Sequence, residues 1–507
     1  MTPDALVARA SASTVASLFF AQVARRREAV AIADGARLET YGALGGRVQK
    51  LAGLLAERGV QPGDRVAVLS ENRAEYLEVF LACATVGAIV ACQNWRLAAP
   101  ELAHCVGLVE PKLAFASARH AAALRQSGKA PEPIVFDADY EALLAAATPC
   151  AEPVALPEDA PLLILYTSGT TGLPKGAVVS HRAQIVRNLV VRAEFGVAAD
   201  DTFVAWSPLY HMGAADNSLG TLMSGGKVVT VDGFDRARLI EIVAKEELGW
   251  LLLMPGMVTS FADELERLRV EPRGIKLCGV MADLVPAQEI ARITALLGAP
   301  YANTFGATET GCPPCSSNRI PVGVTPLRLS KEQSRFCEVK LVGPDEREVP
   351  DGAPGELCMR GPTLFSGYFR APEVNAHEFR GGWYHMGDVF VRNADRTLDF
   401  VDRVKYLIKS GGENVYPAEI ERVLLKDPRV LEAAVVRRPD PKWGEVPVAF
   451  VARQDPAVTE DGLKSLCRAE LAGYKQPKGI HFISPEEFPR SASGKVQRHE
   501  LEKRVRP

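Results

Sequence analysis

Residues 166–176 gather the side chains that bind phosphate. They contain four serine or threonine hydroxyls, three glycines and one lysine. Glycines let backbone N–H groups surround an anion, hydroxyls donate to phosphate oxygens, and lysine adds a positive charge. A flexible linker is a weaker interpretation, because apolar residues 162–165 lead directly into the segment and 178–179 directly follow it. A Walker-type P-loop would continue into a helix after its lysine, whereas Lys175 is followed by Gly176 and the apolar residues 178–179. The pattern therefore predicts a phosphate-binding loop between two strands.

Four further segments follow this loop in a fixed order. They are residues 303–309 (NTFGATE), 382–388 (GWYHMGD), 402–414 (DRVKYLIKSGGEN) and 489–495 (PRSASGK). Together, the five segments resemble the motifs of the adenylate-forming enzymes, which include acyl-CoA synthetases, luciferases and peptide-synthetase adenylation domains. The resemblance covers about residues 40–498. It implies that ATP, with Mg²⁺, activates a carboxylic acid as an acyl-adenylate, and that coenzyme A then takes the acyl group with release of AMP.

The resemblance gives roles to individual residues of the ATP site. Lys495 would stabilise the charge that grows on the α-phosphate, and Glu309, with Thr170, would bind Mg²⁺ through oxygen ligands. Phe305 would stack on adenine, where the family usually has tyrosine, and Asp388 would accept hydrogen bonds from the ribose hydroxyls. The expected ATP-binding residues are Thr167, Ser168, Gly169, Thr170, Thr171, Gly172, Lys175, Phe305, Gly306, Thr308, Asp388, Arg403 and Lys495.

A second group of residues is expected to contact the acid. They are His211, Gly279, Val280 and Met281. By resemblance His211 lines or gates the acyl pocket, and with Lys495 and Glu309 it is an expected catalytic residue. The family usually has small residues where Val280 and Met281 fall, so a narrowed wall is expected. Amino-acid-activating relatives tend to carry an aspartate near residues 212–215, which here are MGAA. A carboxylic acid without an amino group is therefore the expected substrate.

The resemblance also predicts a moving C-terminal domain. Residues 1–401 are expected to form a large N-terminal domain that binds ATP and the acid, and residues 402–507 a small α+β domain. Lys405 would be the hinge about which the small domain rotates between the two half-reactions. Gly411 and Gly412 would line the path of coenzyme A, because glycine permits close backbone approach. Residues 329–338 depart from the family pattern, and the sequence assigns them no function.

Short apolar runs alternate with helical spacing along the large domain. This βαβ rhythm indicates an α/β fold with layers of parallel strands. A helix is predicted at residues 71–86, and residues 131–161 predict a surface connection rich in alanine, proline and acids. Strands are predicted at residues 65–69, 88–92, 227–231, 250–254 and 275–278. In the small domain, helices are predicted at 417–425 and 459–471, and strands at 433–436, 446–451 and 479–483.

Composition excludes several partners. The chain of 507 residues has 59 basic and 62 acidic side chains, a net charge of −3 that gives no electrostatic reason to bind nucleic acid or an anionic membrane. No apolar run approaches the roughly 18 residues of a spanning helix. Ten cysteines without a secretory signal favour reduced thiols in the cytoplasm. Cys312 and Cys315 form a CxxC without a second ligand pair, and two incidental thiols in a loop are expected.

Three functions remain open at this stage. The leading one is an AMP-forming acid–CoA ligase for a short- or medium-chain, alicyclic or aromatic acid. The second is an adenylating enzyme that loads the pantetheine of a separate carrier protein. The third is a nucleotide-binding protein that has lost its chemistry, which the joint presence of Lys175, Glu309, Asp388 and Lys495 disfavours. The sequence leaves the oligomeric state open, a homodimer included.

Overall fold

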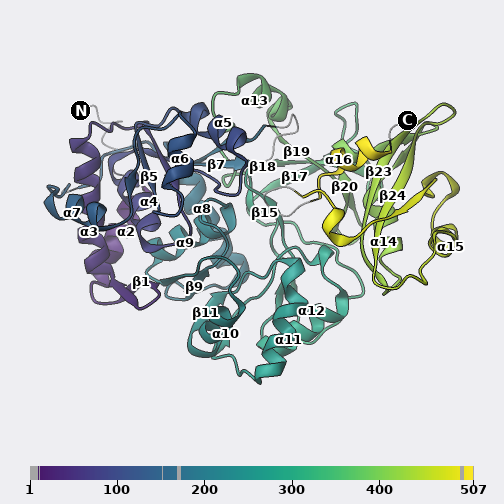
Figure 1. Ribbon diagram of the computed structural model, residues 1–507, viewed down its shortest axis with the longest axis horizontal. Helices are drawn as coiled ribbons and strands as arrows, with labels where there is room; N and C mark the ends of the chain where they lie inside the picture. Colours follow the sequence, from purple (N-terminus) through teal and green to yellow (C-terminus); the bar gives the residue numbers. More distant parts are fainter. Residues whose placement is uncertain (1–9, 11, 151, 168–172, 491–495, 506–507) are drawn as a thin grey trace. The chain divides into compact units, whose positions relative to one another are not determined.

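The computed structural model describes residues 10, 12–150, 152–167, 173–490 and 496–505 (Figure 1). The chain divides into two compact units. The first contains residues 1–338 and 360–382, and the second contains residues 339–359 and 383–507. The expected hinge residues near Asp402 lie at the end of a strand within the second unit. The division at residues 401 and 402 stays a prediction.

Two six-stranded sheets organise the first unit. The first sheet runs in the order β12 (Gly274–Ile275), β11 (Glu247–Trp250), β9 (Thr202–Ala205), β10 (Lys227–Thr230), β1 (Val30–Asp34) and β2 (Arg37–Thr40). The second runs β6 (Ile134–Val135), β5 (Leu113–Ala116), β3 (Arg65–Leu69), β4 (Ile89–Cys92), β7 (Pro161–Thr167) and β8 (Lys175–Ser180). Only β1–β2 and β7–β8 are antiparallel pairs in these sheets. The expected layered α/β fold is confirmed.

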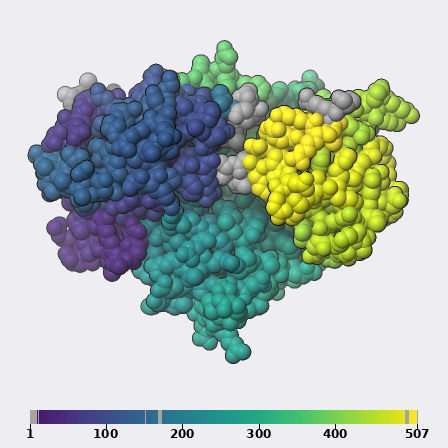
Figure 2. All heavy atoms as spheres, in the orientation of Figure 1, coloured from purple at the N-terminus to yellow at the C-terminus, as the bar shows by residue number. Residues whose placement is uncertain are grey.

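Helices surround these sheets (Figure 1). They are α2 (Val15–Arg25), α3 (Tyr41–Glu57), α4 (Ala74–Val86), α5 (Ala99–Val109), α6 (Ala121–Gln126), α7 (Ala138–Ala146), α8 (His181–Phe195), α9 (Met212–Ser224), α10 (Arg236–Lys245), α11 (Val258–Leu268), α12 (Ala287–Leu297) and α13 (Pro372–Glu378). Every residue of α4 is buried, and Gly87 ends the helix in the left-handed conformation that glycine adopts without strain. Figure 2 shows the segment that carries α10, α11 and α12, in teal, as a lobe beside the purple N-terminal residues.

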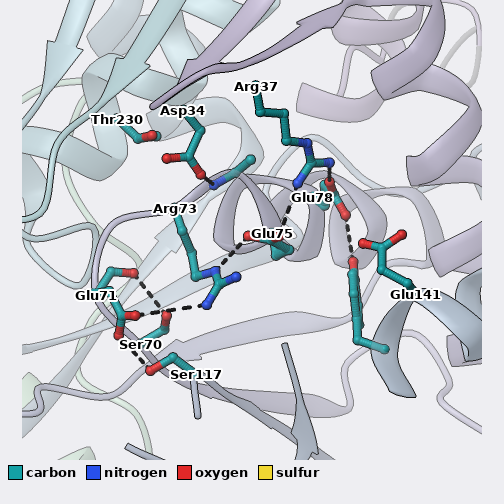
Figure 3. Close-up of polar contacts among 12 residues, drawn as sticks. Asp34, Arg37, Ser70, Glu71, Arg73, Glu75, Glu78, Ser117, Glu141 and Thr230 are labelled. Carbon is teal, nitrogen blue, oxygen red and sulfur yellow. Dashed lines mark hydrogen bonds and ion pairs between the residues drawn. The ribbon is translucent and has the colours of Figure 1, made fainter. Parts of the chain in front are cut away.

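A buried charge network joins α4 to its neighbours (Figure 3). Glu78 is fully buried, and its carboxylate pairs with Arg37 at 3.0 Å and with Arg47 at 2.8 Å. The Tyr140 hydroxyl donates to the same carboxylate at 2.6 Å, and Glu141 pairs with Arg47 at 2.6 Å. A buried carboxylate needs such partners, because its desolvation is costly when it stands alone. The network therefore fixes α7 against α3 and α4.

Three sequence predictions for this unit are wrong, one of them the strand at residues 275–278, since β12 ends at Ile275. Residues 131–161 are not a plain surface connection, since they contain β6 and α7, and Tyr140 of α7 is buried. The strand predicted at residues 250–254 ends at Trp250, because a 3₁₀ helix begins at Pro255 and Leu251 makes only an isolated bridge to Cys278. The continuous apolar run correctly predicted that residues 250–253 are buried. It did not predict where the chain leaves the sheet.

The second unit holds two sheets, formed mostly by antiparallel pairs, and three helices. One sheet runs β17 (Glu338–Val342), β18 (Pro354–Arg360), β19 (Tyr384–Arg392) and β20 (Leu398–Arg403). The other runs β22 (Glu413–Val415), β21 (Ile408–Ser410), β24 (Gly444–Arg453) and β23 (Val430–Asp440), and β25 (Ile480–Phe482) pairs in parallel with β24. The helices are α14 (Pro417–Leu424), α15 (Glu460–Glu470) and α16 (Arg498–Arg504). The predicted helices and strands are present here, with longer β23 and β24. In the described part of the chain, no helix combines the length and apolar character that crossing a bilayer requires.

Candidate active site

The expected phosphate loop joins two paired strands. β7 ends at Thr167 and β8 begins at Lys175, and these two residues face each other in an antiparallel pair. Ser180 then caps α8, its side chain accepting from the backbone N–H of Ala183. The predicted strand–loop–strand arrangement is confirmed at its two flanks. Ser168, Gly169, Thr170, Thr171 and Gly172 lie outside the described residues, so their roles stay predictions.

Lys175 and Glu309 contact the same tyrosine, Tyr368. The Lys175 ammonium lies 4.1 Å from the centre of the Tyr368 ring and 4.0 Å from the Glu378 carboxylate. The Tyr368 hydroxyl donates to Glu309 Oε1 at 2.7 Å. Two motifs that are more than 130 residues apart in the sequence, by the difference 309 − 175, therefore meet at Tyr368. No sequence motif singled out this tyrosine, because an aromatic residue after glycine is most often a packing residue.

Tyr368 is held in place by the strand next to it. Val178 N donates to Gly367 O at 3.0 Å, and Phe369 N donates to Gly176 O at 2.8 Å, so the segment extends the edge of β8. The Tyr368 N–H donates to Asn375 Oδ1 at 2.7 Å. The tyrosine ring is thus carried by backbone that pairs with the strand bearing Lys175. This shared support explains how the ring stays close to the ammonium.

A tight hairpin positions Phe305, Gly306, Thr308 and Glu309. It pairs β14 (Phe305–Ala307) with β15 (Gly311–Cys315). A Cβ atom on Gly306 would lie 2.0 Å from Gly311 O, so only glycine fits there. The buried Arg187 side chain donates to Thr308 O at 3.0 Å and ties the hairpin to α8.

Glu309 offers chemistry that suits Mg²⁺. Its side chain is buried, and among the described residues only Oε1 is bonded, by Tyr368. A carboxylate oxygen is the ligand type that this hard cation prefers. The donor set therefore fits the expected magnesium site at this point of the hairpin.

The CxxC cysteines differ from expectation in one respect. Cys312 and Cys315 lie in β15 and not in a loop, and both are free thiols. Burial raises the pKa of the Cys312 thiol to about 12, and burial also raises the pKa of Cys315. Both sulfurs are therefore protonated at neutral pH, as buried packing thiols are.

The expected acyl wall is a tightly held loop. The Trp250 indole N–H donates to Gly279 O at 3.0 Å, and the Tyr301 hydroxyl donates to Val280 O at 3.0 Å. A Cβ on Gly279 would lie 2.1 Å from the Tyr301 ring, which explains the glycine. Met281 has a φ of 50°, a left-handed conformation that favours glycine. The backbone at position 281 therefore has a conformation that favours glycine, although the residue there carries the large side chain of methionine.

His211 has a local structural role as well as its expected one. It is the N-cap of α9, and its Nδ1 accepts from Gly213 N at 3.3 Å. The side chain is exposed at the start of this helix. Its contact with the acid, like those of Gly279, Val280 and Met281, stays a prediction.

In the second unit, Asp388, the expected acceptor of the ribose hydroxyls, pairs with Arg403. Asp388 of β19 lies opposite Arg403 of β20, and Arg403 Nε is 3.0 Å from Asp388 Oδ1. Asp388 is 2% exposed, whereas the Arg403 side chain is 41% exposed. Glu356 Oε1 accepts from Gly387 N at 3.1 Å and fixes the backbone before the aspartate. The pairing brings two predicted nucleotide contacts together.

The expected hinge residue Lys405 lies directly after this strand. It is exposed, in a 3₁₀ helix of residues Val404–Tyr406, and Arg437 donates to its carbonyl at 3.0 Å. Asp402 is buried and accepts from the backbone N–H of Ala418, at the start of α14, at 2.7 Å. Burial raises the pKa of the Asp402 carboxyl.

The remaining expected contacts lie further along the second unit. Gly411 and Gly412 form the turn between β21 and β22 with φ values of 61° and 88°. A Cβ on Gly411 would lie 2.8 Å from the Trp443 ring. Lys495 lies outside the described residues, but Arg490 and Val496 on either side of its segment form an antiparallel bridge.

Comparisons with known proteins identify the family of this chain. The family described as AMP-binding enzyme matches residues 19–369, and its C-terminal domain matches residues 419–495. A feruloyl-CoA synthase from Amycolatopsis sp. is 35% identical over 94% of this chain and 96% of its own length. An indoleacetate–CoA ligase from Aromatoleum aromaticum is 32% identical over 92% of this chain and 93% of its own.

A solved structure resembles the whole fold. The o-succinylbenzoate CoA synthetase from Bacillus subtilis, in complex with its acyl-adenylate, has a TM-score of 0.84 and 26% identity, covering 96% of this chain and 97% of its own. The same synthetase in complex with ATP and a magnesium ion has a TM-score of 0.82 and 25% identity, covering 96% and 98%. The family expected from the five motifs is confirmed: this chain belongs to the AMP-binding enzymes, the adenylate-forming family.

Proposed function

We propose that this protein ligates a carboxylic acid without an amino group to coenzyme A, using ATP and releasing AMP and pyrophosphate. The observation that supports the proposal is that Lys175, the residue proposed to bind phosphate, and Glu309, the residue proposed to bind Mg²⁺, both contact Tyr368. The test is acid-dependent exchange of pyrophosphate into ATP over a panel of acids, followed by addition of coenzyme A. An enzyme that exchanges pyrophosphate but forms no acyl-CoA would contradict the second step.

The first half-reaction needs positive charge at the phosphates. A carboxylate oxygen of the acid bonds to the α-phosphorus, and the bond from that phosphorus to the pyrophosphate oxygen breaks. Lys175, which lies over the Tyr368 ring, would bind the phosphate oxygens, and Lys495 would stabilise the charge on the α-phosphate. Mg²⁺ at Glu309, with Thr170, would neutralise charge on the departing pyrophosphate. Asp388 and Arg403 would hold the ribose.

The second half-reaction exchanges the nucleotide for a thiol. The sulfur of coenzyme A gives up its proton to solvent and bonds to the acyl carbon. The bond between the acyl carbon and the phosphate oxygen breaks, and AMP leaves with its electrons. Gly411 and Gly412 would let the pantetheine arm approach backbone closely. This step needs Lys495 to leave the phosphate, so residues 402–507 would rotate as the small domain while residues 1–401 hold the adenylate.

An aromatic or alicyclic acid is the proposed substrate class. Among the relatives, several are named for feruloyl, indoleacetate and succinylbenzoate substrates, each of which carries a ring, and one is named for sulfoacetate, which has none. The Met281 side chain narrows the expected wall, which favours a flat or compact acid over a long chain. The panel should therefore include cinnamic, arylacetic, benzoic and straight-chain acids. Exchange with straight-chain acids alone would contradict this class.

The alternatives differ in what the panel would give. A carrier-loading enzyme would show pyrophosphate exchange and would transfer the acyl group to a carrier-protein pantetheine in preference to coenzyme A. A protein that has lost its chemistry would bind ATP without exchange. We also propose the cytoplasm as its location, because all ten cysteines are free thiols.

Met281→Gly should shift preference toward bulkier acids. Removing the side chain widens the proposed wall, and glycine suits the left-handed backbone at this position. The expected change in kcat/KM between a bulky and a small acid is about 1–3 kcal/mol. Met281→Ala is the matched control, because it removes most of the side chain but keeps a Cβ at positive φ. An unchanged acid profile in both variants would contradict the placement of Met281.

Asp388→Ala should raise the KM for ATP by about tenfold or more, because it removes the charged acceptor of the ribose hydroxyls. The acid cannot replace this interaction, so its own KM should change less. Asp399→Ala, on the neighbouring strand β20, is the control. Steady-state exchange kinetics with ATP varied would measure the effect. An ATP KM equal to that of the wild type in a folded Asp388→Ala protein would show that another residue binds the ribose.

A further inference from the structure

A fully buried lysine lies in the segment that departs from the family pattern. Lys331 has no exposed surface, although lysine is almost never fully buried without partners. Its ammonium lies 2.6 Å from Asp283 Oδ2 and donates to Asn303 Oδ1 at 2.6 Å. The lysine is therefore a built part of the interior of the first unit.

The two partners of Lys331 belong to two motifs of the proposed site. Asn303 is the first residue of the adenine motif, residues 303–309. Asp283 lies two residues after Met281, in the 3₁₀ helix Ala282–Leu284 that continues the acyl wall. The Met281 N–H also lies 3.5 Å from Thr304 Oγ1, a second link between the same two segments. One ammonium thus joins the nucleotide motif to the acyl wall.

The segment around Lys331 is itself held at several points. The Asn303 side chain donates to Leu329 O at 3.1 Å and to Ser330 O at 3.2 Å. Further along, the buried Glu194 accepts from Ser334 Oγ at 3.0 Å and from Arg335 N at 2.8 Å. A segment whose two ends are held by buried polar groups can keep the motifs that it contacts in fixed positions relative to each other.

We propose that Lys331 is a positioning residue for the reaction. Its ammonium holds Asn303 and Asp283 together, so that the adenine motif and the acyl wall keep the separation that one acyl-adenylate requires. Lys331 acts through these two residues and touches no substrate. The inference rests on the proposed function, because both motifs are assigned to substrates there.

Three variants separate positioning from simple stabilisation. Lys331→Met removes the donor of the buried Asn303 Oδ1 and the partner of Asp283, whose side chain is 29% exposed. Asp283→Leu leaves the buried ammonium with Asn303 alone, whereas the double variant replaces the ion pair with apolar side chains. Removing one partner of a buried pair is strongly destabilising, and replacing both is often neutral. We therefore expect a lowered melting temperature in each single variant. The double variant should regain part of the stability lost in Asp283→Leu, because no buried ammonium remains without its counter-ion, although Asn303 Oδ1 still lacks its donor.

Kinetics should follow a different pattern from stability. The double variant still lacks the bond from Lys331 to Asn303, so the KM values for ATP and for the acid should both stay raised by about tenfold or more. Lys227→Met is the control, because Lys227 of β10 pairs at 2.6 Å with Glu246, the residue that follows α10, and neither element carries a proposed site residue. It should leave both KM values unchanged. A double variant with the stability and KM values of the wild type would overturn the proposal and leave Lys331 a stabilising residue only.

A binding measurement keeps this test independent of the proposed reaction. Calorimetry with Mg²⁺ and ATP, without acid, should show about tenfold weaker binding to the folded double variant than to the wild type. Equal affinities would overturn the role of Lys331. An absence of pyrophosphate exchange by the wild type with every acid would instead reject the proposed function, and the ATP affinities would still decide the role of Lys331 at the adenine motif.

Discussion

Lys495→Ala should slow acyl-adenylate formation by about a hundredfold or more, the scale of losing one preorganised donor at a developing charge. It should leave thioester formation from supplied acyl-adenylate close to the wild-type rate, because the α-phosphate charge has by then been resolved. Single-turnover assays of the two half-reactions would measure both rates. Equal loss in the two steps would contradict the assignment of Lys495 to the first.

The residues on either side of the Lys495 segment are held by bonds of their own, so the substitution should test the lysine side chain alone. Gln497 N donates to Pro489 O at 2.7 Å, and the Arg498 guanidinium lies 2.6 Å from the Glu421 carboxylate, so both flanks of the segment are anchored. Loss of one side chain between these anchors should leave the fold intact. Lys503→Ala is the matched control, since this lysine is exposed on α16, which follows the Lys495 segment, and pairs only with Glu500 among the described residues. It should leave both half-reactions unchanged.

Sequence predicted best those helices and strands whose bounds are set by residues close to them in the chain. β3 occupies residues 65–69 as predicted, because a short apolar run bounded by a turn is typical of a buried strand in an α/β protein. The end of α4 at Val86 follows from Gly87, which adopts a positive φ. Apolar spacing could not predict α7, because its burial depends on Tyr140 reaching Glu78, 62 residues away in the chain.

The candidate site divides in the same way. The phosphate loop and the adenine motif were predicted because each is a continuous run of residues with its own chemistry. Tyr368 and Lys331 were not predicted, because their significance comes from partners distant in sequence, Lys175 and Glu309 for the tyrosine and Asp283 and Asn303 for the lysine. A single side chain without a local motif carries no such information until the fold brings its partners together.

Lys405→Pro should slow acyl transfer to coenzyme A strongly and spare acyl-adenylate formation. Proline fixes φ near −65°, a value within the range of the 3₁₀ helix Val404–Tyr406, and a hinge must change its backbone angles to move a domain. The Lys405 carbonyl that Arg437 holds at 3.0 Å remains available in the variant. The change therefore restricts rotation with little loss of local contacts.

Lys405→Ala separates the hinge from the side chain. The Lys405 ammonium lies 5.0 Å from the centre of the Tyr406 ring on an exposed surface, and such a contact contributes about 0.5–1 kcal/mol. Alanine removes this contact but keeps the backbone free to rotate, so both half-reactions should continue near the wild-type rate. If alanine and proline slowed acyl transfer equally, the side chain and not the backbone would be responsible. If proline slowed both half-reactions equally, residues 402–507 would not rotate between two poses about Lys405, because a blocked hinge affects only the step that needs the second pose.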